Sequence, residues 1–313
     1  MLAAPFPYYG GKRSVVEDVW TRFGSPSAYV ESFCGSAAIL LGAPRRVPLE
    51  TINDASGFIV NFWRAVKDNP HAVANWADYP LSELDLNARH EWLMSQCGRL
   101  KEELEKDPAW PGDAKVAGWW LWGQCAWMGP GWCDWWDQSD VPHRSPHISN
   151  LGRGIFAQEA FVKHYEVGDI PVLTSAGQAA WGWLAILSKR LERVRILYGD
   201  WKASLNCGYG GEDTAVFLDP PYIGYEDVYS KDYKPSIAVE VQQWCKENEK
   251  LKIALCGHAG DYKALGDGWR EVNWARRSNT GGGANPPAKE AIWFSPACIV
   301  PVDERSTNFM DLL

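Results

Sequence analysis

The chain has 313 residues, of which 46% are hydrophobic and 22% are charged, and its formal net charge is −8. This length and composition provide for a large core in one or two domains and exclude a disordered chain or a coiled coil. The sequence contains no apolar run of about 18 residues and no signal-peptide pattern, so we expect a soluble intracellular protein without a membrane partner.

The cysteines and the net charge bear on the compartment and on the partners. The eight cysteines are scattered and form no Cys-x-x-Cys pair, which predicts reduced thiols rather than a disulfide framework. The negative net charge argues mildly against a nucleic-acid partner, because proteins that bind nucleic acids usually carry a basic face. It does not exclude one, since a local cleft can be basic in an acidic chain.

The amino-terminal segment combines two glycines with a lysine. Residues 5–12 read Pro-Phe-Pro-Tyr-Tyr-Gly-Gly-Lys, and we expect Lys12 to open a helix that runs to about Phe23. The glycines would let the backbone approach a ligand closely, although a glycine-rich turn before a helix is the better explanation of this segment alone. The G-x-x-x-x-G-K-[ST] spacing of a phosphate-binding loop is missing.

Two strand-and-helix units follow, as in a nucleotide-binding sheet. Residues 28–41 predict a strand, a tight turn at Cys34-Gly35-Ser36 and a helix of small residues. Residues 47–54 predict a second strand ending in Asp54, with a helix from Ser56 to about Lys67. Asp54 lies about 20 residues after the first turn, where it can bond ribose hydroxyls; the alternative is an acid favoured by the dipole of the next helix. The full G-x-G-x-x-G pattern is absent, which disfavours a dinucleotide and oxidoreductase chemistry.

Between about residue 76 and residue 188 the pattern changes. Residues 84–105 and the first half of residues 116–136 are typical of helices, and a helix from about Ser175 to Glu192 returns to the sheet. Eight tryptophans fall within 27 residues of this insert: Trp110, Trp119, Trp120, Trp122, Trp127, Trp132, Trp135 and Trp136. A small helical subdomain with a bulky core explains most of them, and one or two could instead stack on DNA. A zinc site could be drawn from Cys125, Cys133, His143 and His147, but the spacing is loose and we expect no metal.

The stretch Asp219-Pro220-Pro221-Tyr222 follows Thr214–Leu218, which predicts a buried parallel strand. Two prolines end the strand and hold a carboxylate and an aromatic ring on a stiff turn at its carboxyl end, where open α/β sheets bind ligands. An aspartate oxygen and a proline carbonyl can accept both N–H bonds of an exocyclic amine, and the tyrosine ring can stack on a planar base. The pattern thus indicates methyl transfer to an amine, although for these four residues alone a plain strand-end turn is equally good.

The carboxyl-terminal part predicts a helix over residues 237–248, a strand at Lys252–Cys256 and an antiparallel hairpin within residues 269–295. Arg276, Arg277 and Lys289 flank a glycine-rich loop and suit phosphate contacts, although a solvated hairpin tip would have the same composition.

These segments together resemble the D12 class of DNA adenine-N6 methyltransferases, the Dam-like enzymes. The matching order is Pro-Tyr-Tyr-Gly-Gly-Lys, Glu-Ser-Phe-Cys-Gly-Ser, Asn-Asp-Ala, a long insertion and Asp-Pro-Pro-Tyr. The resemblance covers residues 5–70 and roughly 190–300, and it implies the class I S-adenosylmethionine-dependent methyltransferase fold. This fold is an α/β, Rossmann-like sheet, here made of residues 1–75 and 189–313, with residues 76–188 as an inserted, mainly helical target-recognition subdomain. The family usually has Pro at Ser32 and Gly or Ala at Ser36, which are small departures.

The resemblance also implies site residues. Those expected at the S-adenosylmethionine site are Tyr9, Gly10, Gly11, Lys12, Phe33, Gly35, Asp54, Asp200, Trp201 and Asp219. In the family, the turn at Phe33 and Gly35 lies under the methionine part, Asp54 binds the ribose, and the pair Asp200-Trp201 reads and packs the adenine. The catalytic residues implied are Asp219, Pro220, Pro221 and Tyr222. Residues suited to nucleic-acid contact are Lys12, Arg144, Asn150, Arg153, Arg276, Arg277 and Lys289.

The sequence therefore predicts a site-specific enzyme that transfers a methyl group from S-adenosylmethionine to the N6 amino group of an adenine flipped out of double-stranded DNA. One alternative keeps the chemistry on cytosine, RNA or a protein amide; another is a degenerate fold that only binds DNA or a partner. The intact turn at Asp219 and the acid at Asp54 argue against the second alternative. Such an enzyme is expected in the cytoplasm of a bacterium or a phage-infected cell, with or without a restriction partner, and its oligomeric state is left open, with a monomer as one option.

Overall fold

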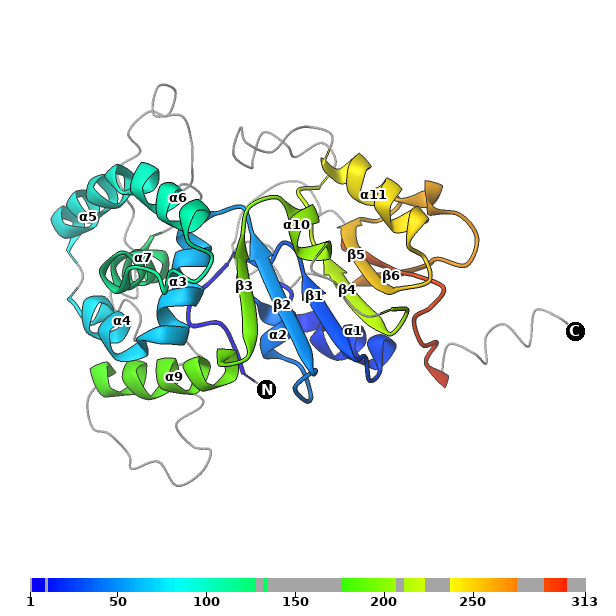
Figure 1. Ribbon diagram of the computed structural model, residues 1–313, viewed down its shortest axis with the longest axis horizontal. Helices are drawn as coiled ribbons and strands as arrows, with labels where there is room; N and C mark the ends of the chain where they lie inside the picture. The colour runs from blue at the N-terminus through cyan, green and yellow to red at the C-terminus, as the bar shows by residue number, and fades with distance from the viewer. Residues whose placement is uncertain are drawn as a thin grey trace, which may run out of the picture.

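A central sheet with helices on both faces joins a group of helices beyond one edge of the sheet (Figure 1). The computed structural model describes residues 2–8, 11–80, 82–127, 132–133, 176–206, 211–222, 237–274 and 290–302. None of the helices in these ranges is long and apolar enough to cross a membrane.

Over the described residues, the sheet has seven strands in the order β3-β2-β1-β4-β5-β7-β6. The strands are β1 (Ala28–Glu31), β2 (Leu49–Asp54), β3 (Val194–Tyr198), β4 (Thr214–Leu218), β5 (Lys252–His258), β6 (Arg270–Trp274) and β7 (Glu290–Phe294). The first five strands are parallel, and β7 pairs antiparallel with both β5 and β6. This closing hairpin and the strands that the sequence predicted around residues 28, 50, 216 and 254 are confirmed.

Successive residues of the central strands enter two different cores, because side chains alternate between the faces of a sheet. In β4, Ala215 and Phe217 lie in one core, and Val216 and Leu218 lie in the other. The first core is covered by η1 (Arg13–Val15), α1 (Val16–Phe23), α2 (Ala38–Leu41) and α3 (Gly57–Asp68). The second is covered by α10 (Trp201–Leu205), α11 (Ile237–Glu247) and η5 (Lys263–Leu265). Burial on both faces explains why β4 is an uninterrupted apolar run.

The crossover from β2 to β3 carries the helical insert. After α3, the helices that the structure describes in it are α4 (Pro70–Ala77), α5 (Glu83–Ser95), α6 (Cys97–Lys106), α7 (Ala114–Ala126) and α9 (Ala176–Leu191). Helices α7 and α9 both pack against α3 and α4, so α3 contacts the insert as well as the sheet. The boundary that we expect after residue 75 falls inside α4, and the domain division stays a prediction.

A buried ion pair ties the returning helix α9 to the sheet. The guanidinium of Arg190 donates to both carboxylate oxygens of Glu50 on β2, over 2.6 and 2.8 Å, and also to the carbonyl of Leu40 over 3.0 Å. The Arg190 and Glu50 side chains are 9% and 3% exposed, so the pair is desolvated. Its loss on one side would leave a buried charge alone.

The tryptophans of the insert form a core, and their rings also contact two cations. Trp120, Trp122 and Trp132 are buried, and Trp110, Trp119 and Trp127 pack against the same core. The Lys115 ammonium lies 4.4 Å from the ring centroids of both Trp92 and Trp119. The Arg89 guanidinium lies 4.2 Å from the ring centroid of Trp122. Trp135 and Trp136 lie outside the described residues.

Strand β3 forms one edge of the sheet, and basic side chains of α3 bond its outer carbonyls. Arg64 Nε donates to the carbonyl of Ile196 over 3.1 Å, and Lys67 Nζ donates to the carbonyl of Val194 over 2.8 Å. Residues two apart on a strand face the same way. These two carbonyls are thus neighbours along the free edge.

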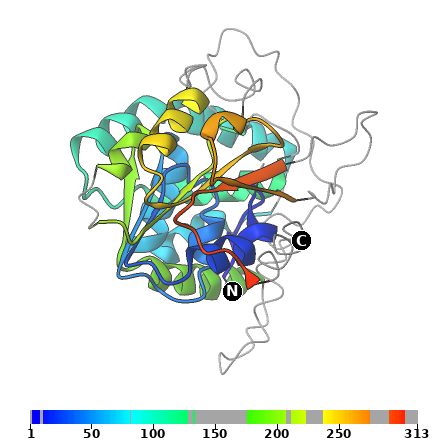
Figure 2. The same cartoon turned by 90° about the vertical axis from the view of Figure 1, so that its right-hand side faces the viewer.

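The segment after β7 runs beside α1 (Figure 2). The backbone N–H of Ile299 donates to the carbonyl of Arg22 over 2.8 Å.

The helix expected from Lys12 to Phe23 is confirmed from Val16 onwards, whereas residues 13–15 form the tighter turn η1. The helical stretch expected over residues 84–105 is two helices, α5 and α6, which meet at Gln96.

Candidate active site

Three loops meet at the carboxyl ends of β1, β2 and β4. The strand order reverses between β1 and β4, so this edge is the topological switch point where open α/β sheets bind ligands. Cys34 N donates to the carbonyl of Asn53 over 2.9 Å, and Ser32 N donates to the carbonyl of Phe217 over 3.4 Å. The parallel register therefore brings together the residues that the sequence predicted at three separate strand ends.

Asp54 organises the turn after β1. Its Oδ2 accepts the Gly35 N–H over 2.9 Å, and its Oδ1 accepts the Ser56 N–H over 2.9 Å. Asp54 is 6% exposed, and burial raises the pKa of its carboxyl, although the backbone N–H bonds act in the opposite direction. Gly35 has φ +44°, a left-handed conformation that favours glycine. The Asp54 carboxylate thus fixes the conformation of the turn after β1. It lies at the end of the sheet where the sequence predicted that Asp54 would bind the ribose.

Phe33 and Trp201 form an aromatic wall beside Asp54. Their ring centroids are 6.1 Å apart with an interplanar angle of 24°. Gly199 N donates to the Asp54 carbonyl over 3.0 Å, which brings the start of α10 to the end of β2. Asp200, an exposed residue, caps α10 by accepting the Lys202 N–H over 2.8 Å. Among the described residues no acceptor reaches the buried Trp201 Nε1.

The residues present at this edge fit a nucleoside cofactor. A buried carboxylate, a flat aromatic wall and an indole N–H with no acceptor among the described residues are the groups that a ribose and a purine ring can use. Gly11 lies near by in sequence and its N–H donates to the Tyr8 carbonyl over 3.1 Å. Tyr9 and Gly10 lie outside the described residues. The assignments of the cofactor site stay predictions.

Lys12 joins the amino-terminal motif to the turn after β4. Its Nζ lies 2.7 Å from Asp219 Oδ2, and the two side chains are 5% and 21% exposed. Burial lowers the pKa of Lys12, but the Asp219 carboxylate and other neighbouring groups outweigh burial and raise it to about 12. Lys12 is therefore a permanent cation at neutral pH, placed against the predicted catalytic acid rather than on an open surface.

The ring of Tyr222 is held on several sides. Lys12 Nζ lies 5.4 Å from its centroid, and the His258 ring meets it edge-on at 4.8 Å. The Tyr222 hydroxyl donates to Oε2 of Glu290 over 3.4 Å. Neither Glu290 nor His258 was predicted from the sequence as a site residue. An acid at the start of an otherwise apolar strand was the one signal that could have found Glu290.

Glu31 is a second buried acid close to this edge. It is 2% exposed at the end of β1. Its Oε2 accepts the Tyr29 hydroxyl over 3.0 Å and the Leu40 N–H over 3.1 Å. Burial raises the pKa of the Glu31 carboxyl to about 8, against the lowering effect of these hydrogen bonds.

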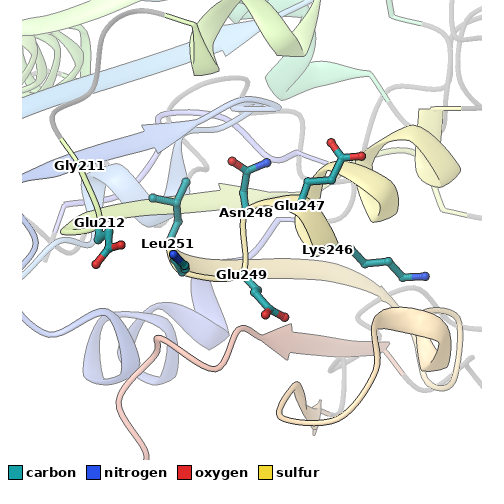
Figure 3. Close-up of a pocket in the computed structure, with 8 residues that line it drawn as sticks. Gly211, Glu212, Lys246, Glu247, Asn248, Glu249 and Leu251 are labelled. Carbon is teal, nitrogen blue, oxygen red and sulfur yellow. The ribbon is translucent and has the colours of Figure 1, made fainter.

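The remaining predicted nucleic-acid contacts lie outside the described residues, namely Arg144, Asn150, Arg153, Arg276, Arg277 and Lys289. A hollow of about 410 Å³ lies elsewhere, lined by residues 211–212 before β4 and residues 246–251 before β5 (Figure 3). These segments are at the amino ends of the strands. The hollow is therefore at the other end of β4 from Asp219, and we assign it no part in the site.

A comparison with protein families finds one that matches residues 8–106, described as the D12 class N6 adenine-specific DNA methyltransferase. No curated protein matches the chain. The matched segment contains Lys12, Gly35 and Asp54, and the mixed α/β sheet is the fold expected of class I methyltransferases. The turn at Asp219 lies beyond the matched segment, but Lys12 contacts it directly. Over residues 8–106 the chain is therefore similar to the D12 class of N6 adenine-specific DNA methyltransferases, enzymes that methylate the N6 amino group of adenine in DNA.

Proposed function

We propose that this enzyme takes its methyl group from S-adenosylmethionine and acts on an adenine flipped out of double-stranded DNA, with Asp219, Pro220 and Tyr222 at the reacting base. The ion pair between Lys12 and Asp219 is the observation that carries the proposal. It connects the segment that matches the methyltransferase family to the turn whose chemistry suits an amine.

The cofactor, when bound, supplies an electrophilic methyl group. Asp54 is suited to accept hydrogen bonds from ribose hydroxyls, because its carboxylate lies beside the first turn. Phe33 and Trp201 are suited to pack against a purine ring. Asp200 is exposed at the start of the same helix and can accept a bond from an exocyclic amine. The family implies this methyl donor.

Asp219 and the Pro220 carbonyl would accept the two N–H bonds of the adenine amino group. The lone pair of this nitrogen is delocalised into the ring, and two acceptors placed off the ring plane favour a tetrahedral, nucleophilic geometry. Lys12 bonds Oδ2 of Asp219, and we assign Oδ1 to the amine. Catalysis would then rest on positioning and electrostatics without a covalent intermediate.

Tyr222 would stack on the flipped base. Stacking of a base on an aromatic ring contributes about 1–3 kcal/mol, which is comparable to the few kcal/mol that base flipping costs. Tyr222 is 9% exposed, and its surroundings hold the ring in one orientation. Contacts to phosphates and base edges are assigned to Arg144, Asn150, Arg153, Arg276, Arg277 and Lys289, and we assign target recognition to residues 76–188.

The test is to express the protein in a methylation-free bacterial host and to map modified bases by single-molecule sequencing. We expect N6-methyladenine at one short sequence motif. Asp219→Ala should abolish the modification while the purified variant still binds S-adenosylmethionine in a calorimetric titration. Asp213→Asn is the matched control, because Asp213 immediately precedes β4 and pairs with Lys252 at the far end of the strand.

Three results would overturn parts of the proposal. An unmodified genome with the wild-type protein would exclude double-stranded DNA as the substrate. Modified cytosines would assign the chemistry to the alternative base. Normal methylation by Asp219→Ala would remove the proposed acceptor from the mechanism.

A further inference from the structure

Glu290 is a buried carboxylate that has no role in the reaction proposed above. It is the first residue of β7 and is 6% exposed. In the sheet it lies directly opposite His258 of β5. A carboxylate at such a depth is costly unless it receives hydrogen bonds or faces a positive charge.

The surroundings of Glu290 belong to the reacting end of the sheet. The Tyr222 hydroxyl donates to Oε2 of Glu290 over 3.4 Å. The Tyr222 ring also meets the His258 ring edge-on, with centroids 4.8 Å apart and an interplanar angle of 80°. Two neighbouring strands therefore contact the same tyrosine: Glu290 of β7 accepts a bond from its hydroxyl, and His258 of β5 packs against its ring.

We propose that Glu290 is a positioning residue for methyl transfer, which fixes and polarises Tyr222 through its hydroxyl group. This inference rests on the proposed function, because it requires Tyr222 to stack on the flipped adenine. A ring that must align with a base within about 10–20° needs support from its neighbours. Pro220 and Pro221 fix the backbone side of Tyr222, and Lys12 and His258 contact its ring. The bond from the hydroxyl to Glu290 restrains the far end of the ring.

A carboxylate acceptor does more than restrain the ring. A hydrogen bond to a charged acceptor draws the hydroxyl proton away from the phenol and increases the electron density of the ring. The adenine amine gains positive charge as its bond to the methyl group forms. An electron-rich ring face attracts positive charge more strongly, so Glu290 would stabilise the reacting state more than the bound state.

The experiment combines three single variants with one double variant. Glu290→Gln keeps an acceptor oxygen but loses the charge, Glu290→Met removes the acceptor, and Tyr222→Phe removes the donor. The rate of methyl transfer is measured in a single turnover, with radiolabelled S-adenosylmethionine and unmethylated genomic DNA. Affinity for S-adenosylmethionine and the thermal midpoint are measured in parallel.

We expect Glu290→Met and Tyr222→Phe each to slow the transfer about 10-fold, with Glu290→Gln between them and the wild type. The double variant Tyr222→Phe/Glu290→Met should be no slower than the slower single variant, because both changes remove the same contact. Cofactor affinity should stay within about twofold of the wild-type value. Glu271→Gln is the matched control, since Glu271 is an exposed glutamate on the neighbouring strand β6.

Independent, multiplicative losses in the double variant would show that Glu290 does not act through Tyr222. Full activity of Tyr222→Phe would overturn the inference even if the Glu290 variants failed to fold. A wild-type protein that transfers no methyl group to DNA would instead refute the proposed function, so the two failures can be distinguished.

Discussion

Replacing Glu31 by glutamine should make the protein more stable in alkaline solution. The Glu31 carboxyl has a pKa of about 8 in the folded protein, against a reference value of 4.5. Because the folded state holds this proton more tightly, the carboxyl contributes stability below pH 4.5 that is lost as the pH rises through 8. Glutamine keeps an oxygen that can accept from the Tyr29 hydroxyl and the Leu40 N–H.

The magnitude follows from the width of this interval. Between the two pKa values the free energy of unfolding falls by about 1.4 kcal/mol per pH unit. From pH 5.5 to pH 8 the wild type should therefore lose roughly 3 kcal/mol that Glu31→Gln does not lose. For a chain of this size, that difference corresponds to a thermal midpoint shift on the order of 10 °C.

The assay is a set of thermal unfolding curves of both proteins at half-unit steps from pH 5.5 to pH 8.5. Other titrating groups affect both proteins alike, so the difference between the two midpoints isolates Glu31. We expect this difference to change steadily in favour of Glu31→Gln as the pH rises. Two midpoint curves that run parallel over the whole interval would refute a raised pKa for Glu31.

Three further substitutions test the pair between α9 and β2, the first turn and the pair at the catalytic turn. Arg190→Met should cost about 3–5 kcal/mol, because Glu50 would remain buried and unpaired; thermal unfolding measures the loss. Gly35→Ala should weaken cofactor binding in a calorimetric titration, because φ is +44° and the new Cβ would lie 2.4 Å from the Tyr8 ring. Lys12→Met should slow methyl transfer by at least about 100-fold in a single-turnover assay, because Asp219 would lose the cation that orients it.

Each of these has an outcome that would contradict it. The double variant Arg190→Met/Glu50→Gln should recover part of the loss, and a double variant as unstable as Arg190→Met would deny the charge argument. If Gly35→Ala bound the cofactor with wild-type affinity, the turn and the Tyr8 ring would have to accommodate the new Cβ at little cost. Lys12→Met with normal turnover would show that Asp219 needs no counter-charge.

Much of the sheet could be predicted from the sequence because its strands are buried on both faces. Thr214–Leu218 was predicted and found with the same bounds, since a threonine and four apolar residues precede Asp219 and the two prolines that stop the strand. The strand ending at Asp54 was predicted within two residues of its start. The helix over residues 57–68 follows from its apolar spacing.

The contacts across the site could not be predicted in the same way. Lys12 and Asp219 are more than 200 positions apart, and only the parallel register and the fold of the amino-terminal segment bring them together. Glu31 and Glu290 are acids in strands, and sequence patterns assign acids to solvent or ligands rather than to a core. The tryptophans were expected in a core, but local spacing did not predict that they would surround Lys115 and Arg89.

The cations that bond the outer carbonyls of β3 also protect the protein from association. A bare strand edge is a template on which the strand of another chain can add. On β3 the carbonyls of Val194 and Ile196 already accept from Lys67 and Arg64. An incoming strand would have to displace an ammonium and a guanidinium from these carbonyls, and breaking those charged hydrogen bonds offsets the ladder bonds that the strand would gain. At the high concentrations of an overproducing cell, growth of the sheet from copy to copy is therefore blocked at β3, by two side chains of a helix that serves the fold in other ways.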